Sequence, residues 1–312
     1  MDILLQLLLL VVGFVMLIKG ADWFVEGASK IADRFGIPQL VIGLTIVAMG
    51  TSLPEATVSV SAALQGSAEI TIGNVVGSNI LNVLIILGVT SVVRTISVQK
   101  STILVEIPFM IGVSVLLTLL GVWGNDINRL EGVIFWVLFI AYLLYLLHMA
   151  KKGAPMEEVP QADKNESLLK MILLVLIGGA LVIIGGNVTV NAATELATIF
   201  GMSERFIGLT IVALGTSLPE LVTSVTAAIK GKADIAVGNI VGSNIFNILF
   251  VVGTSALIIP VSYAGFLIDS IVAIAAAVLL LVCVLRGKLT RIGGIVLLLG
   301  YVAYFIYLIQ IL

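Results

Sequence analysis

The stretch GTSLPE occupies Gly50–Glu55 within an apolar segment and occurs again at Gly215–Glu220. Proline has no backbone N–H, and its ring crowds the carbonyl of the residue four positions earlier. A helix through either copy must therefore break or kink at Pro54 or Pro219. Each copy also ends in a glutamate, whose charge is costly in apolar surroundings and marks a functional site by default. The repeated stretch predicts two broken helices, each carrying a buried carboxylate.

The composition identifies an integral membrane protein. Of the 312 residues, 60% are hydrophobic and 11% are charged, whereas soluble domains have roughly 45–50% apolar and about 25% charged residues. Apolar stretches close to the roughly 20 residues that cross a bilayer fill almost the whole chain. The first of them follows Asp2 rather than a basic region and lacks a small-residue cleavage site, so we expect a retained helix.

Single copies of histidine and cysteine exclude several kinds of site. His148 and Cys283 are the only residues of their types, which disfavours zinc sites and histidine-based nucleophilic triads. No nucleophile with a positioned base is visible, so an intramembrane enzyme is the weakest interpretation. We expect no enzymatic activity and no cofactor.

Charged, Gly-bearing and Pro-bearing stretches divide the apolar sequence into ten predicted helices. A charged linker, KKGAPMEEVPQADKNES at 151–167, separates a first five-helix repeat at 1–150 from a second at 168–312. The fold class predicted is an all-α integral membrane protein with ten transmembrane helices. Their predicted extents are 3–19, 39–64, 70–93, 103–122, 130–149, 168–190, 205–229, 235–258, 266–285 and 291–311. An alternative end for the first lies near Ile31, because Asp22, Glu26 and Lys30 can form one solvated face.

The basic residues predict the orientation of the chain in the membrane. With ten spans, only Arg129 and Arg205 of the sixteen Lys and Arg lie on one side, and the other fourteen (16 − 2) lie on the opposite side. Basic residues favour the cytoplasm, so both termini are expected outside and the linker inside. The lack of a long regulatory loop favours a prokaryotic cell membrane.

The two halves share sequence as well as length. IGLTIVAMGTSLPE from Ile42 matches IGLTIVALGTSLPE from Ile207, and GNVVGSNILN from Gly73 matches GNIVGSNIFN from Gly238. The offset is 165 in both cases (207 − 42 = 238 − 73 = 165). This self-similarity indicates an internal duplication. Because the second and seventh helices cross in opposite directions, the halves are predicted to be inverted repeats, with the substrate site between them.

The polar residues of both repeats form an oxygen-rich set. Glu55 and Glu220 are accompanied by the hydroxyls of Thr51, Ser52, Thr216 and Ser217 and by carbonyls freed at the breaks. Hard cations such as Ca²⁺ prefer such ligands, whereas zinc, copper and iron prefer the imidazole and thiolate that are missing here.

A polar stripe on the third and eighth helices is predicted to face these breaks. Its residues recur at i, i+4 and i+8 and so share one helix face: Asn74, Ser78, Asn82, Asn239, Ser243 and Asn247. Hydrogen bonding between helices without an ion is an open alternative for Asn74 and Asn239. Four other carboxylates near predicted helix ends are expected to be solvated at the membrane interface: Glu106, Glu131, Glu195 and Asp269.

With these motifs the sequence resembles the cation/Ca²⁺ exchanger superfamily, and most of all its prokaryotic sodium/calcium exchangers. The resemblance covers both repeats, roughly 42–93 and 207–258. It implies that Glu55 and Glu220 bind Ca²⁺ together with the carbonyls of Thr51 and Thr216. It also implies sodium sites completed by the carbonyls of Ala48 and Ala213 and by Ser52, Ser78, Ser217 and Ser243. Asn82 and Asn247 complete the set. An Asp in place of Asn247 is associated with potassium-dependent relatives, so the amide here disfavours potassium dependence.

The function predicted from the sequence is secondary active antiport of Na⁺ against Ca²⁺ by alternating access. An H⁺/Ca²⁺ or other divalent cation exchanger is the nearest alternative, and a passive cation channel is a weaker one that the inverted broken helices disfavour. The expected partners are Ca²⁺ and Na⁺ as substrates and the lipid bilayer, with no nucleic acid. The oligomeric state stays open and a monomer is compatible with the sequence.

Overall fold

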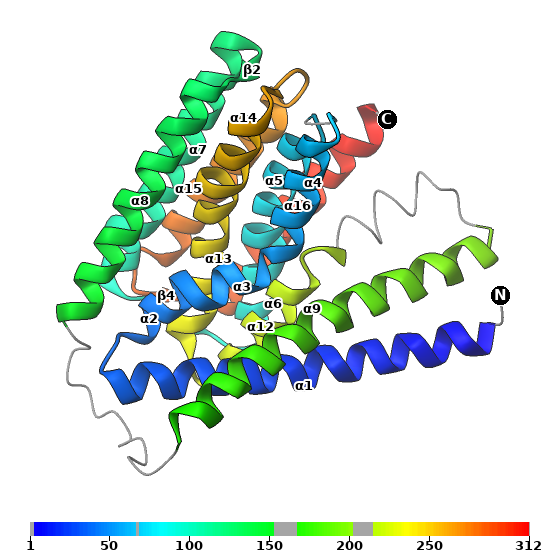
Figure 1. Ribbon diagram of the computed structural model, residues 1–312, viewed down its shortest axis with the longest axis vertical. Coiled ribbons are helices and arrows are strands. Elements are labelled where there is room, and N and C mark those ends of the chain that lie inside the picture. Colours follow the sequence, from blue (N-terminus) through cyan, green and yellow to red (C-terminus); the bar gives the residue numbers. More distant parts are fainter. Residues whose placement is uncertain (1–2, 67–68, 153–166, 202–214, 312) are drawn as a thin grey trace.

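The computed structural model describes residues 3–66, 69–152, 167–201 and 215–311, and these residues form a bundle of helices (Figure 1). In the first half, with η denoting a π-helix, the elements are α1 Ile3–Phe35, α2 Gln39–Ile42, η1 Gly43–Val47, α3 Ala48–Thr51, α4 Leu53–Leu64, α5 Glu69–Leu81, η2 Asn82–Leu87, α6 Gly88–Val93, η3 Thr102–Glu106, α7 Ile107–Gly124 and α8 Arg129–Lys152. The second half contains α9 Leu168–Ile199, α12 Leu218–Ile229, α13 Ala233–Phe246, η5 Asn247–Val252, α14 Gly253–Ile258, α15 Leu267–Val284 and α16 Arg291–Ile311.

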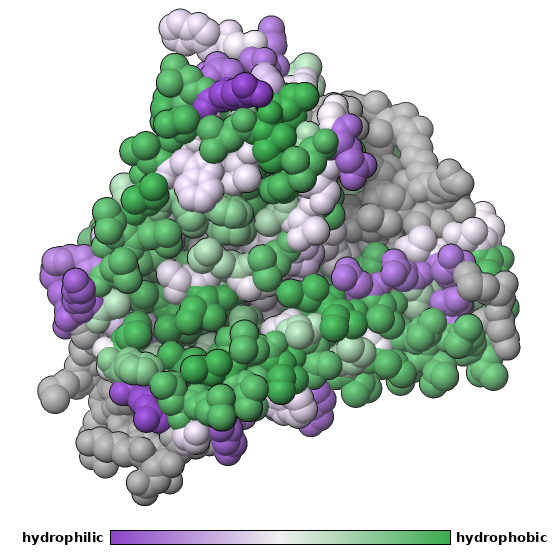
Figure 2. Space-filling view, in the orientation of Figure 1, coloured by the Kyte–Doolittle hydropathy of each residue, from purple (hydrophilic) through white to green (hydrophobic). Residues whose placement is uncertain are grey.

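The membrane spans follow the predicted pattern closely within the described part of the chain. Eight helices there are long and apolar enough to cross a bilayer, and the bent pair Gln39–Thr51 and Leu53–Leu64 makes nine. Apolar side chains cover most of the molecular face in Figure 2, as lipid contact requires. Of the predicted span at 205–229, residues 215–229 are described and contain α12, whereas residues 205–214 lie outside the described residues. The count of ten therefore stays a prediction.

Two predicted spans are too short. The sixth was expected to end at 190, but α9 continues to Ile199. The first was predicted at 3–19 with an alternative extension toward Ile31, and α1 follows the alternative and continues to Phe35. Polar residues do not interrupt α1, because Lys30 forms an ion pair with Glu26 one turn earlier, at 2.8 Å. Both helices are thus longer than the roughly 20 residues that a perpendicular span needs.

These two long helices lie side by side in opposite directions (Figure 1). Gly20 of α1 meets Gly178 of α9, and Gly13 meets Gly185, so the backbones approach closely. A methyl group on Gly20 would lie 2.8 Å from the carbonyl oxygen of Gly178. Small residues at such a crossing provide the packing that holds helices together in a lipid environment.

Four two-residue strands, which the sequence did not predict, join the two halves. β1 Ile96–Ser97 pairs with β4 Lys288–Leu289, and β2 Asp126–Ile127 pairs with β3 Val261–Ser262, both antiparallel. Each pair takes one strand from each half. The connections of the two halves are therefore hydrogen-bonded to each other at two places.

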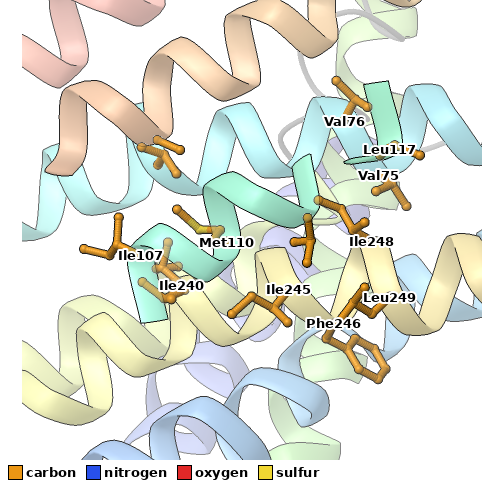
Figure 3. Close-up of a cluster of buried hydrophobic side chains, with 14 of the residues drawn as sticks. Val75, Val76, Ile107, Met110, Leu117, Ile240, Ile245, Phe246, Ile248 and Leu249 are labelled. Carbon is orange, nitrogen blue, oxygen red and sulfur yellow. The ribbon is translucent and has the colours of Figure 1, made fainter. Parts of the chain in front are cut away.

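The core lies around α5 and α13. In the most apolar window of the spans Ile70–Val93 and Ala233–Ile258, 78% and 94% of residues are buried, against 17% to 44% in the other spans of at least 18 residues. Side chains of α5, α7, α13 and η5 fill this region (Figure 3): Val75, Val76, Ile107, Met110, Leu117, Ile240, Ile245, Phe246, Ile248 and Leu249. Two apolar helices packed on all sides thus hold the polar stripe in the middle of the protein.

Candidate cation site

The first GTSLPE stretch contains a helix break. The segments Gln39–Thr51 and Leu53–Leu64 meet at Ser52 with a bend of 50°. Pro54 stands in the first turn of α4 and provides no N–H for the carbonyl of Gly50. In the second copy, Ser217 precedes α12 with nearly the same backbone angles as Ser52: φ −91° and ψ 5° against φ −85° and ψ 8°.

The helices that follow both stretches also end alike. The backbone of Gly66 after α4 and of Gly231 after α12 is left-handed, with φ of 81° and 79°. Each glycine N–H bonds to a carbonyl three residues earlier, at 3.2 Å in the first half and 3.0 Å in the second. Glycine is favoured at such helix ends because it carries no Cβ. The two short helices therefore have the same length and carry their glutamates in the same turn.

The glutamates are buried and are bonded across the two halves. Glu55 and Glu220 are each 1% exposed. The Ser52 hydroxyl donates to Oε1 of Glu220 at 2.8 Å, and the Ser217 hydroxyl donates to Oε1 of Glu55 at 3.5 Å. Neither serine caps its own helix with its side chain. The two hydroxyls instead tie each half to the carboxylate of the other.

The second oxygen of each carboxylate has no protein partner. Oε2 of Glu55 and Oε2 of Glu220 are buried without a hydrogen bond, and so are Oδ1 of Asn82 and Oδ1 of Asn247. Within the described part of the chain, neither glutamate forms an ion pair with a basic side chain. Buried acceptors without donors cost free energy, and a cation bound by such oxygens would offset this cost.

Asn82 and Asn247 each begin a π-helix, η2 and η5. The two positions differ by 165 residues (247 − 82 = 165), the offset of the sequence repeat. Short π-helical turns are rare and often lie at functional sites. The sequence pattern gave no sign of them.

The other predicted ligands are placed as follows. Thr51, Ser78 and Ser243 are buried, and Thr216 is partly buried. The Ser243 hydroxyl donates to the carbonyl of Ala48 at 3.3 Å. The Thr51 hydroxyl lies within hydrogen-bonding distance of the Val47 carbonyl and of Asn239 Oδ1, at 3.1 and 3.0 Å. Ala213 lies outside the described residues.

Asn74 and Asn239 hold helices together. Asn74 donates to the Glu55 carbonyl at 3.1 Å and to the Ser59 hydroxyl at 2.8 Å. Asn239 makes the equivalent bonds to Glu220 and Ser224, at 3.4 and 2.9 Å. Of the two alternatives left open by the sequence, hydrogen bonding between helices is the one that the structure supports for this pair.

Asn79 and Asn244 are polar core residues that sequence reasoning missed. They lie one position after Ser78 and Ser243, off the predicted stripe, and are 5% and 3% exposed. Each donates to the backbone carbonyl of the other, at 3.2 and 3.3 Å. Their recurrence at the 165-residue offset, together with the cost of an amide in an apolar span, was the signal that could have found them.

The expectation for Glu106 was wrong. It was expected at a solvated interface, but it is fully buried, and the Tyr145 hydroxyl donates to its Oε1. Asp269 also accepts a tyrosine hydrogen bond, from Tyr304 at 2.6 Å. Asp269 stays partly exposed, as expected, whereas at Glu106 a tyrosine of a neighbouring helix takes the place of water, which the sequence of one helix alone does not reveal.

Together these features define a polytopic membrane protein with an oxygen-lined, doubly acidic site between two related halves. The chain belongs to the sodium/calcium exchanger protein family, whose profile matches residues 5–148 and 170–310. It is a family of membrane transporters rather than of enzymes.

Similar proteins support this membership over nearly the whole chain. CaxA of Alkalimonas amylolytica is 41% identical over 94% of this chain and 95% of its own length. The sodium/calcium exchanger MaX1 of Methanosarcina acetivorans is 34% identical over 97% of this chain and 98% of its own. The solved structure of the sodium-calcium exchanger NCX_Mj soaked with zero Na⁺ and Ca²⁺ is 30% identical, with a TM-score of 0.86 over 98% of this chain and 100% of that one.

Proposed function

We propose that this protein is a secondary active antiporter that exchanges Na⁺ for Ca²⁺ across a prokaryotic cell membrane by alternating access. One observation carries the proposal: in each half a glutamate and an asparagine of the repeated motifs, Glu55 with Asn82 and Glu220 with Asn247, hold a buried side-chain oxygen without a hydrogen-bond partner. Membership of the family and the similarity to MaX1 and NCX_Mj support the choice of ions.

The chemistry of the four oxygens suits a hard divalent cation. Two carboxylates carry a charge of −2, which one Ca²⁺ neutralises (−2 + 2 = 0), and the two amide oxygens add neutral ligands. Na⁺ takes the same oxygen donors with half the charge. Because both ions need the same glutamates, they compete for the site, and this competition makes coupled exchange possible.

We further propose the ligands that surround this centre. Ca²⁺ is bound by Glu55 and Glu220 together with the carbonyls of Thr51 and Thr216. Na⁺ occupies outer sites formed by carbonyls and hydroxyls of both halves, namely those of Ala48, Ala213, Ser52, Ser78, Ser217 and Ser243. The bond from Ser243 to the Ala48 carbonyl supports this set, because it shows that residues of the two halves meet there.

The architecture that we propose for transport has ten spans in two inverted repeats, 1–150 and 168–312, with both termini outside and the linker at 151–167 inside. The seventh helix is broken at Pro219 as the second is near Pro54. The closely packed α1 and α9 slide together past the core, so that the site opens to one side at a time. Their continuous glycine contact supports movement as one unit.

The test of this function is uptake of radioactive Ca²⁺ by proteoliposomes that contain the purified protein. Vesicles loaded with Na⁺ and diluted into Na⁺-free buffer are expected to accumulate Ca²⁺, whereas vesicles with only a K⁺ gradient are not. Uptake driven by a pH gradient alone would make the protein an H⁺/Ca²⁺ exchanger. Ca²⁺ movement that needs no counter-ion gradient would indicate a channel.

A further inference from the structure

Asn79 and Asn244 have no part in the proposed ligand set, yet they lie beside it. Their reciprocal bonds join the last turn of α5 to the last turn of α13. In each bond the side-chain amide N–H of one asparagine donates to the backbone carbonyl of the other. The side-chain oxygens of both residues are thereby left to accept hydrogen bonds.

These two oxygens accept from the proposed ligands. Asn82 donates its amide N–H to Oδ1 of Asn244 at 2.9 Å, and Asn247 donates to Oδ1 of Asn79 at 3.1 Å. The nitrogen and oxygen of a side-chain amide point away from each other, so these bonds to the nitrogens of Asn82 and Asn247 also fix the direction of their oxygens. The oxygens of Asn82 and Asn247 are the ones that are buried without a partner.

We propose that Asn79 and Asn244 are positioning residues, an amide clamp that turns the side-chain oxygens of Asn247 and Asn82 into the cation site. This inference rests on the proposed function and deepens it. The clamp acts across the halves, because Asn79 of the first half orients Asn247 of the second, and Asn244 orients Asn82.

The clamp also selects an amide over a carboxylate at the two ligand positions. A carboxylate in place of Asn247 has no N–H for Oδ1 of Asn79, so two acceptor oxygens would face each other at about 3 Å. The same holds for Asn82 and Asn244. The clamp therefore holds the charge of the proposed Ca²⁺ ligands at −2, the value contributed by Glu55 and Glu220.

The test compares Asn79→Leu with the wild type in proteoliposomes, because leucine fills nearly the same space without hydrogen bonds. The expected result is a KM for Ca²⁺ raised about tenfold with kcat nearly unchanged, as when an outer-shell partner of a metal ligand is lost. Thr90→Val is the matched control. It removes a buried hydroxyl whose bond, to the Ile86 carbonyl at 2.6 Å, stays within its own helix, and its KM is expected to equal that of the wild type.

Double variants test the crossed pattern. In an Asn247→Ala background, adding Asn79→Leu should not raise KM further, because the oriented ligand is already missing. In an Asn82→Ala background, Asn79→Leu should retain most of its tenfold effect. Asn244→Leu should show the mirror-image pattern.

Three outcomes would overturn the clamp: an unchanged KM in Asn79→Leu, an equal effect of Asn79→Leu in both alanine backgrounds, or a loss of thermal stability as the sole change. The last would indicate a purely structural role. A wild type without Na⁺-driven or H⁺-driven Ca²⁺ exchange would instead contradict the proposed function, and with it the clamp that rests on it.

Discussion

The internal repeat is well preserved at the candidate site but not on the long helices α1 and α9. At the candidate site the halves are alike: Glu55 and Glu220 have the same burial, and both accept a serine bond from the opposite half. On the long helices the halves differ. The offset of 165 that relates the glutamates places Asn187, Asn191 and Glu195 of α9 against Asp22, Glu26 and Lys30 of α1.

The difference continues where α1 meets the core. Lys230 directly follows α12, and its Nζ contacts Asp22 of α1 twice. The distance to the Asp22 carboxylate is 2.7 Å, and the distance to the Asp22 backbone carbonyl oxygen is 2.8 Å. Glu26 lies 3.9 Å from the same amine. The position equivalent to Lys230 in the first half is Gln65 (230 − 165 = 65), which carries no charge to form an ion pair.

This contrast suggests that the two regions have different functions: the site binds the ion, and the contacts of α1 influence which access state is populated. In a perfectly symmetric inverted repeat, the two access states would have equal free energies. Sequence differences away from the site can favour one state without changing the ligands. If the protein works by the alternating access proposed above, the ion pairs of Lys230 would set the ratio of the states, and the site would keep its symmetry because one cation needs oxygens from both halves.

The largest effect is expected at the symmetric region. Glu55→Gln and Glu220→Gln should each lower Ca²⁺ exchange by roughly a hundredfold or more, because loss of one partner in a buried charge pair costs about 2–5 kcal/mol. The two variants should be impaired to a similar degree, since the halves contribute alike. Proteoliposome uptake measures the effect, with thermal unfolding as the check on folding.

Glu106→Gln is the matched control for these variants. It changes a carboxylate of equal burial that binds Tyr145 rather than the site, and we expect it to retain exchange. Retained exchange in Glu55→Gln or Glu220→Gln would remove that glutamate from the ligand set.

A smaller effect, on stability, is expected where α1 and α9 touch. Gly20→Leu places a side chain against Gly178, Leu181 and Val182 of α9, where even a methyl group would be 2.8 Å from the nearest atoms. Overpacking of this kind costs about 1–3 kcal/mol or more, so the melting temperature in detergent should fall by several degrees.

Gly112→Ala provides the comparison for this glycine change. Beyond its chain neighbours and the adjacent backbone of its own helix, no described atom lies within 4 Å of a Cβ at Gly112, which is exposed on α7. Its melting temperature should stay the same or rise slightly, because alanine favours the helix. Equal melting temperatures for the two variants would contradict the close contact of α1 and α9.

The smallest effect is expected at the asymmetric region. Lys230→Gln gives the second half the residue that the first half has, and we expect the two access states to become more equal in population by a factor of about 2 to 5. The factor is small because a partly exposed ion pair contributes at most about 1 kcal/mol. Distances between spin labels on α1 and α13 in detergent measure the populations.

Lys232→Gln controls for the general loss of a nearby positive charge and should leave the populations unchanged. If Lys230→Gln behaves in the same way, the ion pairs with α1 have no influence on the access equilibrium. High salt should reproduce the effect of Lys230→Gln in the wild type, since it screens exposed charges.

Much of the fold could be predicted because membrane spans depend on local composition. Stretches of apolar residues gave the extents of α7, α8, α15 and α16 to within a few residues. Pro54 predicted a break whose position, at Ser52, depends only on the chain next to it. The glutamates stood out because a carboxylate is rare in such surroundings.

The features that could not be predicted depend on contacts between distant segments. The alternative extension of the first span toward Ile31 was predicted, but not the partner of its polar residues at Lys230, 208 positions away. Asn79 meets Asn244 across 165 positions, and the predicted polar stripe did not include either residue. The π-helices begin at Asn82 and Asn247, where the helix adjusts to the network between the halves.

The reciprocal contacts also bear on how the two halves fit together. Each of these contacts between the halves occurs twice, with the roles of the halves exchanged. Asn79 and Asn244 donate to each other's backbone carbonyls, and Ser52 and Ser217 each donate to the glutamate of the other half. The strand pair β1–β4 likewise has its counterpart in β2–β3. Such isologous contacts are those of a two-fold homodimer. The two halves of this chain therefore fit together as two copies of one subunit would.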